Sequence, residues 1–116
     1  MELYTKEKKF KSILLETFGN SPRVRIIDFF MDNPKFEFTK SEVMEALGMC
    51  KRTFYKHFRD VKAQGIVIVS GRRGRAKLYK LNLEHPLVRL LMQYELQVSL
   101  QYAKKEAEKE KVSAEI

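Results

Sequence analysis

Five basic side chains and no acid occupy the segment SGRRGRAKLYKLN, which spans residues 70–82. A second basic group precedes it in KRTFYKHFRDVK, residues 51–62, where Asp60 is the single acid. Residues 51–82 carry ten Lys and Arg against one acid, while the other 84 residues carry 13 bases and 14 acids. The net charge of +8 therefore originates in one part of the chain. Positive charge concentrated in this way is expected of a surface that binds a polyanion such as a nucleic acid.

The residue types that usually carry catalysis or bind metals are scarce. The chain has two histidines, His57 and His85, and one cysteine, Cys50. Their spacing fits neither a zinc site nor a Ser-His-acid triad, and no glycine-rich phosphate loop is present. We therefore expect no enzyme, no metal and no cofactor. A single cysteine excludes an internal disulfide and suits a reducing cytoplasm. We interpret Cys50 as a small filler residue, with a thiol sensor at a basic helix N-terminus as the alternative.

Helix signals precede the basic segments. The apolar spacing over residues 3–18 predicts a first helix. Ser21 and Pro22 combine a hydroxyl cap with a proline at the first helical position, which predicts a second helix that ends near Asn33. The following KFEFT alternates apolar and polar residues, which suits a very short strand.

The basic segments themselves predict a helix and a hairpin. Thr39 and Glu42 form a capping box at the start of a third helix, and a glycine turn leads to a fourth helix over residues 51–64. Two short strands around Gly-Arg-Arg-Gly follow, and Pro86 begins a long fifth helix that reaches about Lys111. Helix, glycine turn, helix and basic hairpin is the order of a winged helix-turn-helix. The predicted fold is therefore mainly α (α+β), with a two-stranded β wing and a long C-terminal helix.

The fourth helix has one apolar and one basic side. With 100° between successive residues, Phe54, Phe58 and Val61 form a buried stripe. Thr53 stands at the N-terminal edge, and the outward side presents Arg52, Tyr55, Lys56 and Arg59. Arginine can bind guanine through two hydrogen bonds, and lysine and threonine can contact bases or phosphates. A helix with this outward side fits the major groove of DNA.

The hairpin is the predicted wing. Arg72, Arg73 and Arg75 lie at or beside its tip, where they can follow the phosphate backbone or enter the minor groove. Gly71 and Gly74 would allow a positive φ at the bend. The side chains expected to anchor the hairpin on the core share one parity and are Val67, Val69, Tyr79 and Leu81.

The fifth helix predicts a homodimer. Apolar residues recur there at spacings of four and three, close to a coiled-coil seam, at Leu87, Leu91, Tyr94, Val98 and Tyr102. About 25 helical residues span roughly 37 Å, which exceeds what the small core needs. We divide the chain into an N-terminal helix that also contacts the partner copy (1–18), a winged-helix domain (19–83) and a dimerisation helix with its tail (84–116). No apolar run reaches the roughly 18–20 residues of a membrane span, so we expect no membrane contact.

Three segments together resemble a family of small archaeal winged-helix transcription regulators, which are broadly similar to ArsR-like and MarR-like repressors. These segments are FGNSPRVRIIDFF, FTKSEVMEALGMCKRTFYKHF and GRAKLYKLNLEHPLVRLL, between about Phe18 and Leu91. The resemblance implies a DNA-binding regulator with a recognition helix and a wing. By position, it places the groove readers at Lys51, Arg52, Thr53, Tyr55 and Lys56. Cys50 departs from the family pattern, which usually has a capping serine, so we expect a weak helix cap there.

These inferences predict a cytoplasmic, sequence-specific transcription regulator that binds double-stranded DNA as a homodimer, with no evident small-molecule effector. The predicted DNA-binding residues are Lys51, Arg52, Thr53, Tyr55, Lys56, Arg59, Arg72, Arg73, Arg75 and Lys77. Two alternatives stay open. One is a winged-helix RNA-binding or protein-interaction adaptor, since a fold does not fix function. The other is a non-specific, chromatin-type DNA binder.

Overall fold

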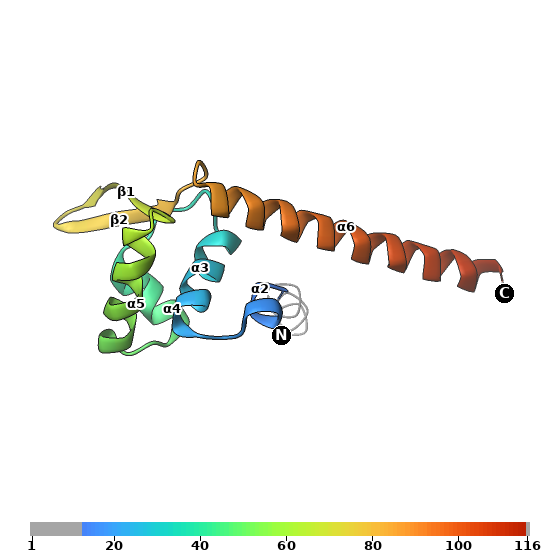
Figure 1. Cartoon of the computed structure of the whole chain (residues 1–116), viewed down its shortest axis with the longest axis horizontal. Coiled ribbons are helices and arrows are strands. Elements are labelled where there is room, and N and C mark those ends of the chain that lie inside the picture. The colour runs from blue at the N-terminus through green and yellow to red at the C-terminus, as the bar shows by residue number, and fades with distance from the viewer. Residues whose placement is uncertain (1–12, 116) are drawn as a thin grey trace.

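The structure, a computed structural model, describes residues 13–115, with side chains as far as Lys109. Its elements are α2 (Ile13–Phe18), α3 (Pro22–Asp32), α4 (Lys40–Leu47), α5 (Lys51–Ala63), β1 (Val67–Arg73), β2 (Ala76–Leu81) and α6 (Pro86–Glu115) (Figure 1). The predicted mainly helical fold with a two-stranded hairpin and a long C-terminal helix is confirmed. Most of the helix predicted over residues 3–18 lies outside the described residues, which include only its end as α2.

The helix starts follow the predicted caps. Ser21 Oγ accepts a hydrogen bond from the Val24 N–H, and Pro22 is the first residue of α3. The predicted capping box is complete at α4, because the Thr39 hydroxyl and the Glu42 carboxylate each accept the other residue's backbone N–H. Gly48 then ends α4 in the left-handed conformation, with φ of 62°, which favours glycine. These local signals set the turn between α4 and α5.

β2 lies in the middle of a small antiparallel arrangement. It pairs with β1 along the hairpin, and on its other side Tyr79 exchanges two backbone hydrogen bonds with Phe38. The segment KFEFT therefore contributes one bridge rather than a strand of its own. The pairing of β1 with β2 shifts register between Val69 and Gly71, which marks a bulge in β1.

Two expectations about the hairpin are wrong. Val69 is 44% exposed, although Val67, Tyr79 and Leu81 of the same predicted set are buried. The reason is the central place of β2: β1 runs along the outer edge of the arrangement, where only its first residue reaches the core. Gly71 has no positive φ and lies at the bulge instead, whereas Gly74 has a φ of 63° at the turn.

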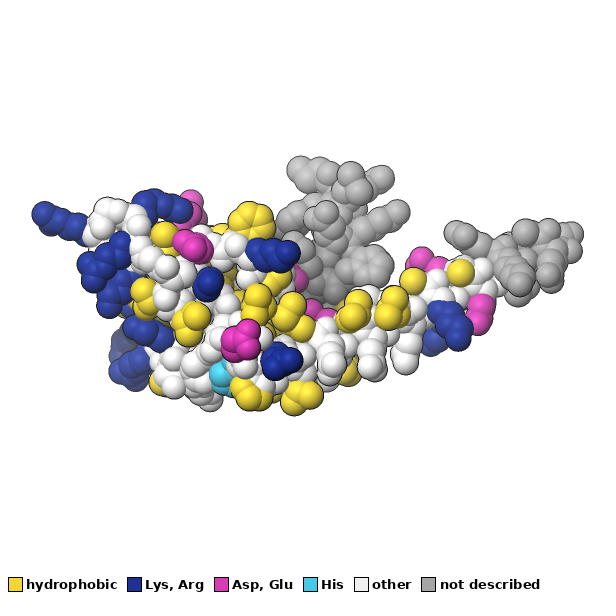
Figure 2. Space-filling view, turned by 90° about the horizontal axis from the view of Figure 1, so that it is seen from above, with side chains coloured by type: hydrophobic (Ala, Val, Ile, Leu, Met, Phe, Trp, Pro, Cys, Tyr) yellow, Lys and Arg dark blue, Asp and Glu magenta, His cyan; other side chains and the backbone are white. Residues whose placement is uncertain are grey.

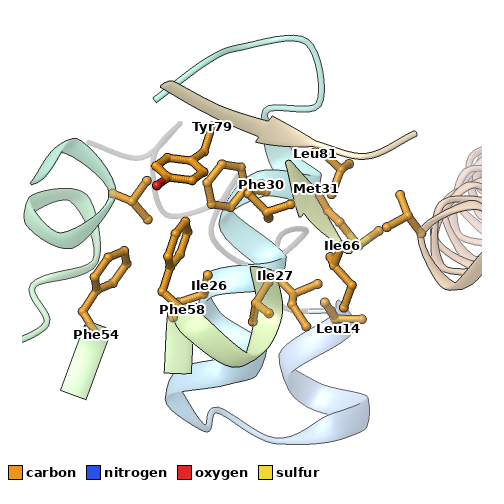
Figure 3. Close-up of a cluster of buried hydrophobic side chains, with 14 residues drawn as sticks. Leu14, Ile26, Ile27, Phe30, Met31, Phe54, Phe58, Ile66, Tyr79 and Leu81 are labelled. Carbon is orange, nitrogen blue, oxygen red and sulfur yellow. The ribbon is translucent and has the colours of Figure 1, made fainter. Parts of the chain in front are cut away.

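Aromatic rings form the centre of the core (Figure 3). Phe54 and Phe58 of α5 stack with their ring centroids 5.1 Å apart, and Phe58 meets Tyr79 of β2 edge-to-face at 4.9 Å. Phe30 of α3 closes the group, with its ring 6.4 Å from that of Phe58. Burying one such side chain stabilises a fold by about 1.5–3 kcal/mol. This packing fixes α5 against both α3 and the hairpin.

α6 begins in the core and then leaves it. Val88 is fully buried, and Leu91 and Met92 pack partly against the same cluster. The rest of the helix projects away from the end of the molecule that carries the hairpin (Figure 1). The described residues accordingly measure 61 × 32 × 26 Å along the principal axes. None of the described helices is long and apolar enough to cross a membrane.

Candidate nucleic-acid interface

α5 presents its basic side to solvent. Phe54, Phe58 and Val61 are buried as the periodicity predicts. The opposite side carries three exposed bases, Arg52, Lys56 and Arg59, which we call the basic face of α5. Within the described part of the chain, no carboxylate forms an ion pair with any of them. Their charges are therefore available to an external anion.

The single acid of α5, Asp60, borders this face but is paired within the chain. The Asp60 carboxylate lies on the flank of α5 that faces α3, where it pairs with the Arg23 guanidinium. Both side chains are about 40% exposed, so the pair contributes little to stability. Its effect on the site is electrostatic, because the positive charge of Arg23 neutralises the negative charge of Asp60 on the side of α5 remote from the wing.

Lysines surround the aromatic rings between α4, α5 and β2. The ammonium groups of Lys40 and Lys51 lie 5.2 and 5.6 Å from the centroid of the Tyr55 ring, which is a cation–π distance. Lys62 approaches the Tyr79 ring at 5.5 Å. Lys40 and Lys62 were not among the predicted contacts. The helical wheel places Lys62 on the side of Tyr55, but only the packing of α4 brings Lys40 to the same place.

The hairpin adds charge at the same end of the molecule. Arg72, Arg75 and Lys77 are exposed and have no ion pair within residues 13–115. Arg73 differs, because its guanidinium lies 3.1 Å from the Glu42 carboxylate of α4. Lys and Arg side chains gather at the end formed by α5 and the hairpin, opposite the free end of α6 (Figure 2). The ten predicted contacts therefore belong to elements that share one end.

Cys50 occupies the N-cap of α5 without capping it. Its side chain makes no hydrogen bond to the first backbone N–H groups, as the sequence predicts for a thiol. The exposed thiol instead donates to the Thr53 hydroxyl at 3.2 Å. The Thr53 hydroxyl, followed by the N–H groups at the helix start, lowers the pKa of Cys50, because both stabilise the thiolate. Thr53 is half-buried and engaged with Cys50, so it is less accessible than its basic neighbours.

The predicted dimer residues divide between the core and solvent. Leu91 packs against the chain's own core. Leu87 and Leu91 both line an apolar hollow that Leu14 and Phe18 also line. Further along α6, Val98 is half-buried, while Tyr94 and Tyr102 are exposed.

A second apolar row was missed by the sequence analysis. Leu96 and Leu100 are each 60% exposed and lie on the side of α6 roughly opposite Val98. α6 is thus apolar on two sides over this stretch. Glu95 lies between these rows at the α3 side, where burial and then the nearby Asp32 carboxylate raise its pKa.

The side chains that could bind a metal are dispersed in the described residues, and so are the two histidines. No three His, Cys, Asp or Glu side chains gather there in a way that could hold a metal ion. His57 lies at the edge of the core, and its Nδ1 is buried without a hydrogen-bond partner in this part of the chain. His85 contacts the Gln64 carbonyl at 2.8 Å, which ties the start of α6 to the end of α5.

The solved structures that this chain resembles include proteins described as transcription regulators. A protein described as a possible transcriptional regulator from Methanosarcina mazei Go1 matches with a TM-score of 0.53 and 13% identity, over 90% of this chain and 88% of that one. Reduced HlyU from Vibrio cholerae has a TM-score of 0.53 and 16% identity over 84% and 97%. MepR in a Staphylococcus aureus MepR–DNA complex has a TM-score of 0.56 and 13% identity over 97% and 94%.

These likenesses define the winged-helix fold of the chain. The sequence itself matches no family model and no curated protein. At identities of 13–16% the shared feature is the arrangement of helices and wing. Membership of the small archaeal family that the sequence resembles stays a prediction.

Proposed function

We propose that this chain is a sequence-specific transcription regulator that binds double-stranded DNA as a homodimer. The observation that carries the proposal is the basic face of α5, whose three bases are exposed and without an ion pair in the described residues. They project from a helix whose other side is locked into the core by Phe54 and Phe58. An α-helix is about 10–12 Å across with its side chains, which matches the roughly 12 Å width of the major groove.

The wing supplies the contacts that do not depend on sequence. With α5 in the major groove, the hairpin at the same end of the protein lies beside the DNA. Arg72, Arg75 and Lys77 then follow the phosphate backbone or enter the minor groove. Lys51 and Lys40, held against the Tyr55 ring, add phosphate contacts between the helix and the wing. Such contacts position the protein, while base contacts from Arg52 and Lys56 specify the sequence.

The dimer rests on α6. Its exposed apolar residues beyond Met92 have no covering element in the described chain, and a second copy of the helix would cover them. Two copies related by a two-fold axis would present two α5 helices to half-sites about one DNA turn apart. The MepR complex shows a protein of this fold bound to DNA, which supports the assignment of the partner.

The alternatives differ from the proposal in the partner or in the preference for a base sequence. Double-stranded RNA has a deep, narrow major groove that side chains cannot read, so α5 would have no place in it. A protein-interaction adaptor is disfavoured because the exposed side of α5 carries bases. Among the described residues of α5, Tyr55 is the only large apolar side chain that is exposed, which leaves little apolar surface for a protein partner. A non-specific DNA binder would use the same phosphate contacts without base preference.

Titration at several salt concentrations tests the proposal. The full chain is mixed with a duplex DNA obtained by random-sequence selection, with a scrambled duplex and with a double-stranded RNA of the same length. We expect the logarithm of the DNA affinity to fall linearly with the logarithm of the salt concentration, by about 0.9 per phosphate contact. A preference for the selected over the scrambled duplex supports sequence specificity. A nearly salt-independent affinity, or equal binding to RNA, would contradict the proposal.

A further inference from the structure

One carboxylate lies beside the wing on the DNA-facing end of the molecule. Glu42 is the third residue of α4, and its Oε1 accepts the Thr39 N–H at 2.9 Å. The same Oε1 accepts a hydrogen bond from the Arg73 guanidinium at 3.1 Å. A single oxygen therefore joins the start of α4 to the end of β1, although 31 residues separate the two side chains in sequence.

The capping box alone does not account for a charged residue at this position. Glutamine also serves at the third position of a capping box, although the helix dipole favours a negative charge there. Glutamate differs by its negative charge, and this charge is persistent: the Thr39 N–H, and to a smaller extent Arg73, lower the pKa of Glu42. A permanent anion next to a wing arginine weakens the attraction of that arginine to DNA.

A guanidinium binds carboxylate and phosphate oxygens with the same geometry. Arg73 and Glu42 are 62% and 43% exposed, so water screens their pair and the pair is readily broken. Arg73 is also within two residues of Arg72 and Arg75, which have no ion pair in the described chain. A duplex that contacts these neighbours therefore brings a phosphate within reach of Arg73.

We propose that Glu42 is an internal substitute for a DNA phosphate: it binds Arg73 in the free protein, and Arg73 exchanges it for a backbone phosphate when DNA binds. The inference rests on the proposed function and adds a regulator of affinity to it. Breaking the pair lowers the affinity for every duplex by the same factor, because phosphate contacts carry no sequence information. Base preference stays with α5, and occupation of unrelated DNA is reduced.

Substitution of Glu42 by glutamine tests the exchange. Glu42→Gln keeps the capping box and removes the charge. We expect it to raise the affinity for the selected and the scrambled duplex alike, by about two- to fivefold at low salt. In a chain that already carries Arg73→Ala, Glu42→Gln should give only the small gain expected from the loss of any nearby negative charge. Arg73→Ala alone should reduce the salt slope by about one, because one phosphate contact is lost.

Glu45→Gln is the matched control. Glu45 lies about one helical turn after Glu42 in α4. It is exposed and forms no ion pair in the described residues, so its substitution changes only the general electrostatic field near the proposed interface. Thermal unfolding of each variant shows that the fold is kept. A Glu42→Gln gain no larger than that of Glu45→Gln, or one that keeps its full size with Arg73→Ala, overturns the exchange while wild-type binding upholds the proposed function. A wild-type chain that binds no duplex overturns the proposed function itself.

Discussion

Two arginines of this protein each bind a carboxylate, and the difference between them shows how individual side chains shape the basic end. Arg23 matches Asp60 on the flank of α5 that faces α3, remote from the wing. Arg73 binds Glu42 at the wing itself. The basic face of α5 includes neither pair, so in the proposed function its bases would meet DNA without first leaving an intramolecular partner.

Alanine substitutions should separate base contacts from phosphate contacts. Arg52→Ala or Lys56→Ala should cost about 1–3 kcal/mol of binding free energy for each lost base contact and should also reduce the preference for the selected duplex. Arg72→Ala should weaken binding to selected and scrambled duplexes equally, because it removes a phosphate contact. The ratio of the two affinities, measured at one salt concentration, distinguishes these outcomes. A change of preferred sequence caused by Arg72→Ala alone would show that the wing reads the minor groove.

The residues of the basic face could be predicted because they follow from one number, the 3.6-residue period of the helix. Once Phe54 and Phe58 are assigned to the core, the orientation of Arg52 and Lys56 is fixed. The Glu42–Arg73 pair could not be predicted in the same way. Each partner already had a local role, one as a capping residue and the other as a wing base, and only tertiary packing brings them together.

At the scale of elements, α5 is the best-packed helix of the site and begins at a poor cap. Its three apolar residues are almost fully buried, yet the Cys50 side chain leaves the first backbone N–H groups without a capping bond. α4, in contrast, has a complete capping box. α5, the proposed recognition helix, is therefore held by its core contacts rather than by its N-terminus.

Replacing Cys50 by serine should stabilise the protein. A serine hydroxyl can accept the Thr53 N–H, as the best N-cap residues do, and the expected gain is about 0.5–1 kcal/mol in the free energy of unfolding. Urea unfolding of the full chain followed by circular dichroism measures it. Thr39→Ala, which removes an existing cap at α4, is the control and should cost about 1 kcal/mol. No gain from Cys50→Ser would indicate that the thiol already satisfies the helix start.

The hairpin shows where element prediction stops. Its two strands and the turn at Gly74 follow from the pattern of apolar residues and glycines. The exposure of Val69 does not, because alternation identifies the two faces of a strand but not how far the core extends beneath it. That extent depends on Phe38, which pairs with β2 and makes it the inner strand.

At the scale of the whole molecule, α6 connects the winged core to the proposed dimer contact. Leu91 packs on the core of its own chain, so the part of the predicted seam that is left for a partner begins at about Tyr94. The second row, Leu96 and Leu100, was missed because a coiled-coil spacing selects one stripe and ignores apolar residues on the other side. A helix that is apolar on two sides has room for more than one neighbouring helix.

Charges placed in the outer seam should separate the two copies. Val98→Glu with Tyr102→Glu would bring like charges together across a dimer contact, at a cost of several kcal/mol. The winged core should survive, since neither residue belongs to its buried cluster. Light scattering should then report a folded monomer that binds one half-site weakly. Gln97→Glu, about 100° around α6 from Val98, is the control and should stay dimeric; a dimeric Val98→Glu, Tyr102→Glu variant would place the contact elsewhere.

The buried Val88 and the exposed outer residues of α6 belong to one unbroken helix, from Pro86 to Glu115. No flexible linker therefore separates the proposed DNA-binding end from the proposed dimer contact. In such an arrangement, the number of helical residues between the two sets the angle between them. One residue inserted between Leu91 and Val98 would turn the winged core by about 100° and shift it by about 1.5 Å relative to its partner. In the proposed dimer, the number of residues along this single helix would thus set the spacing and the relative rotation of the two DNA half-sites.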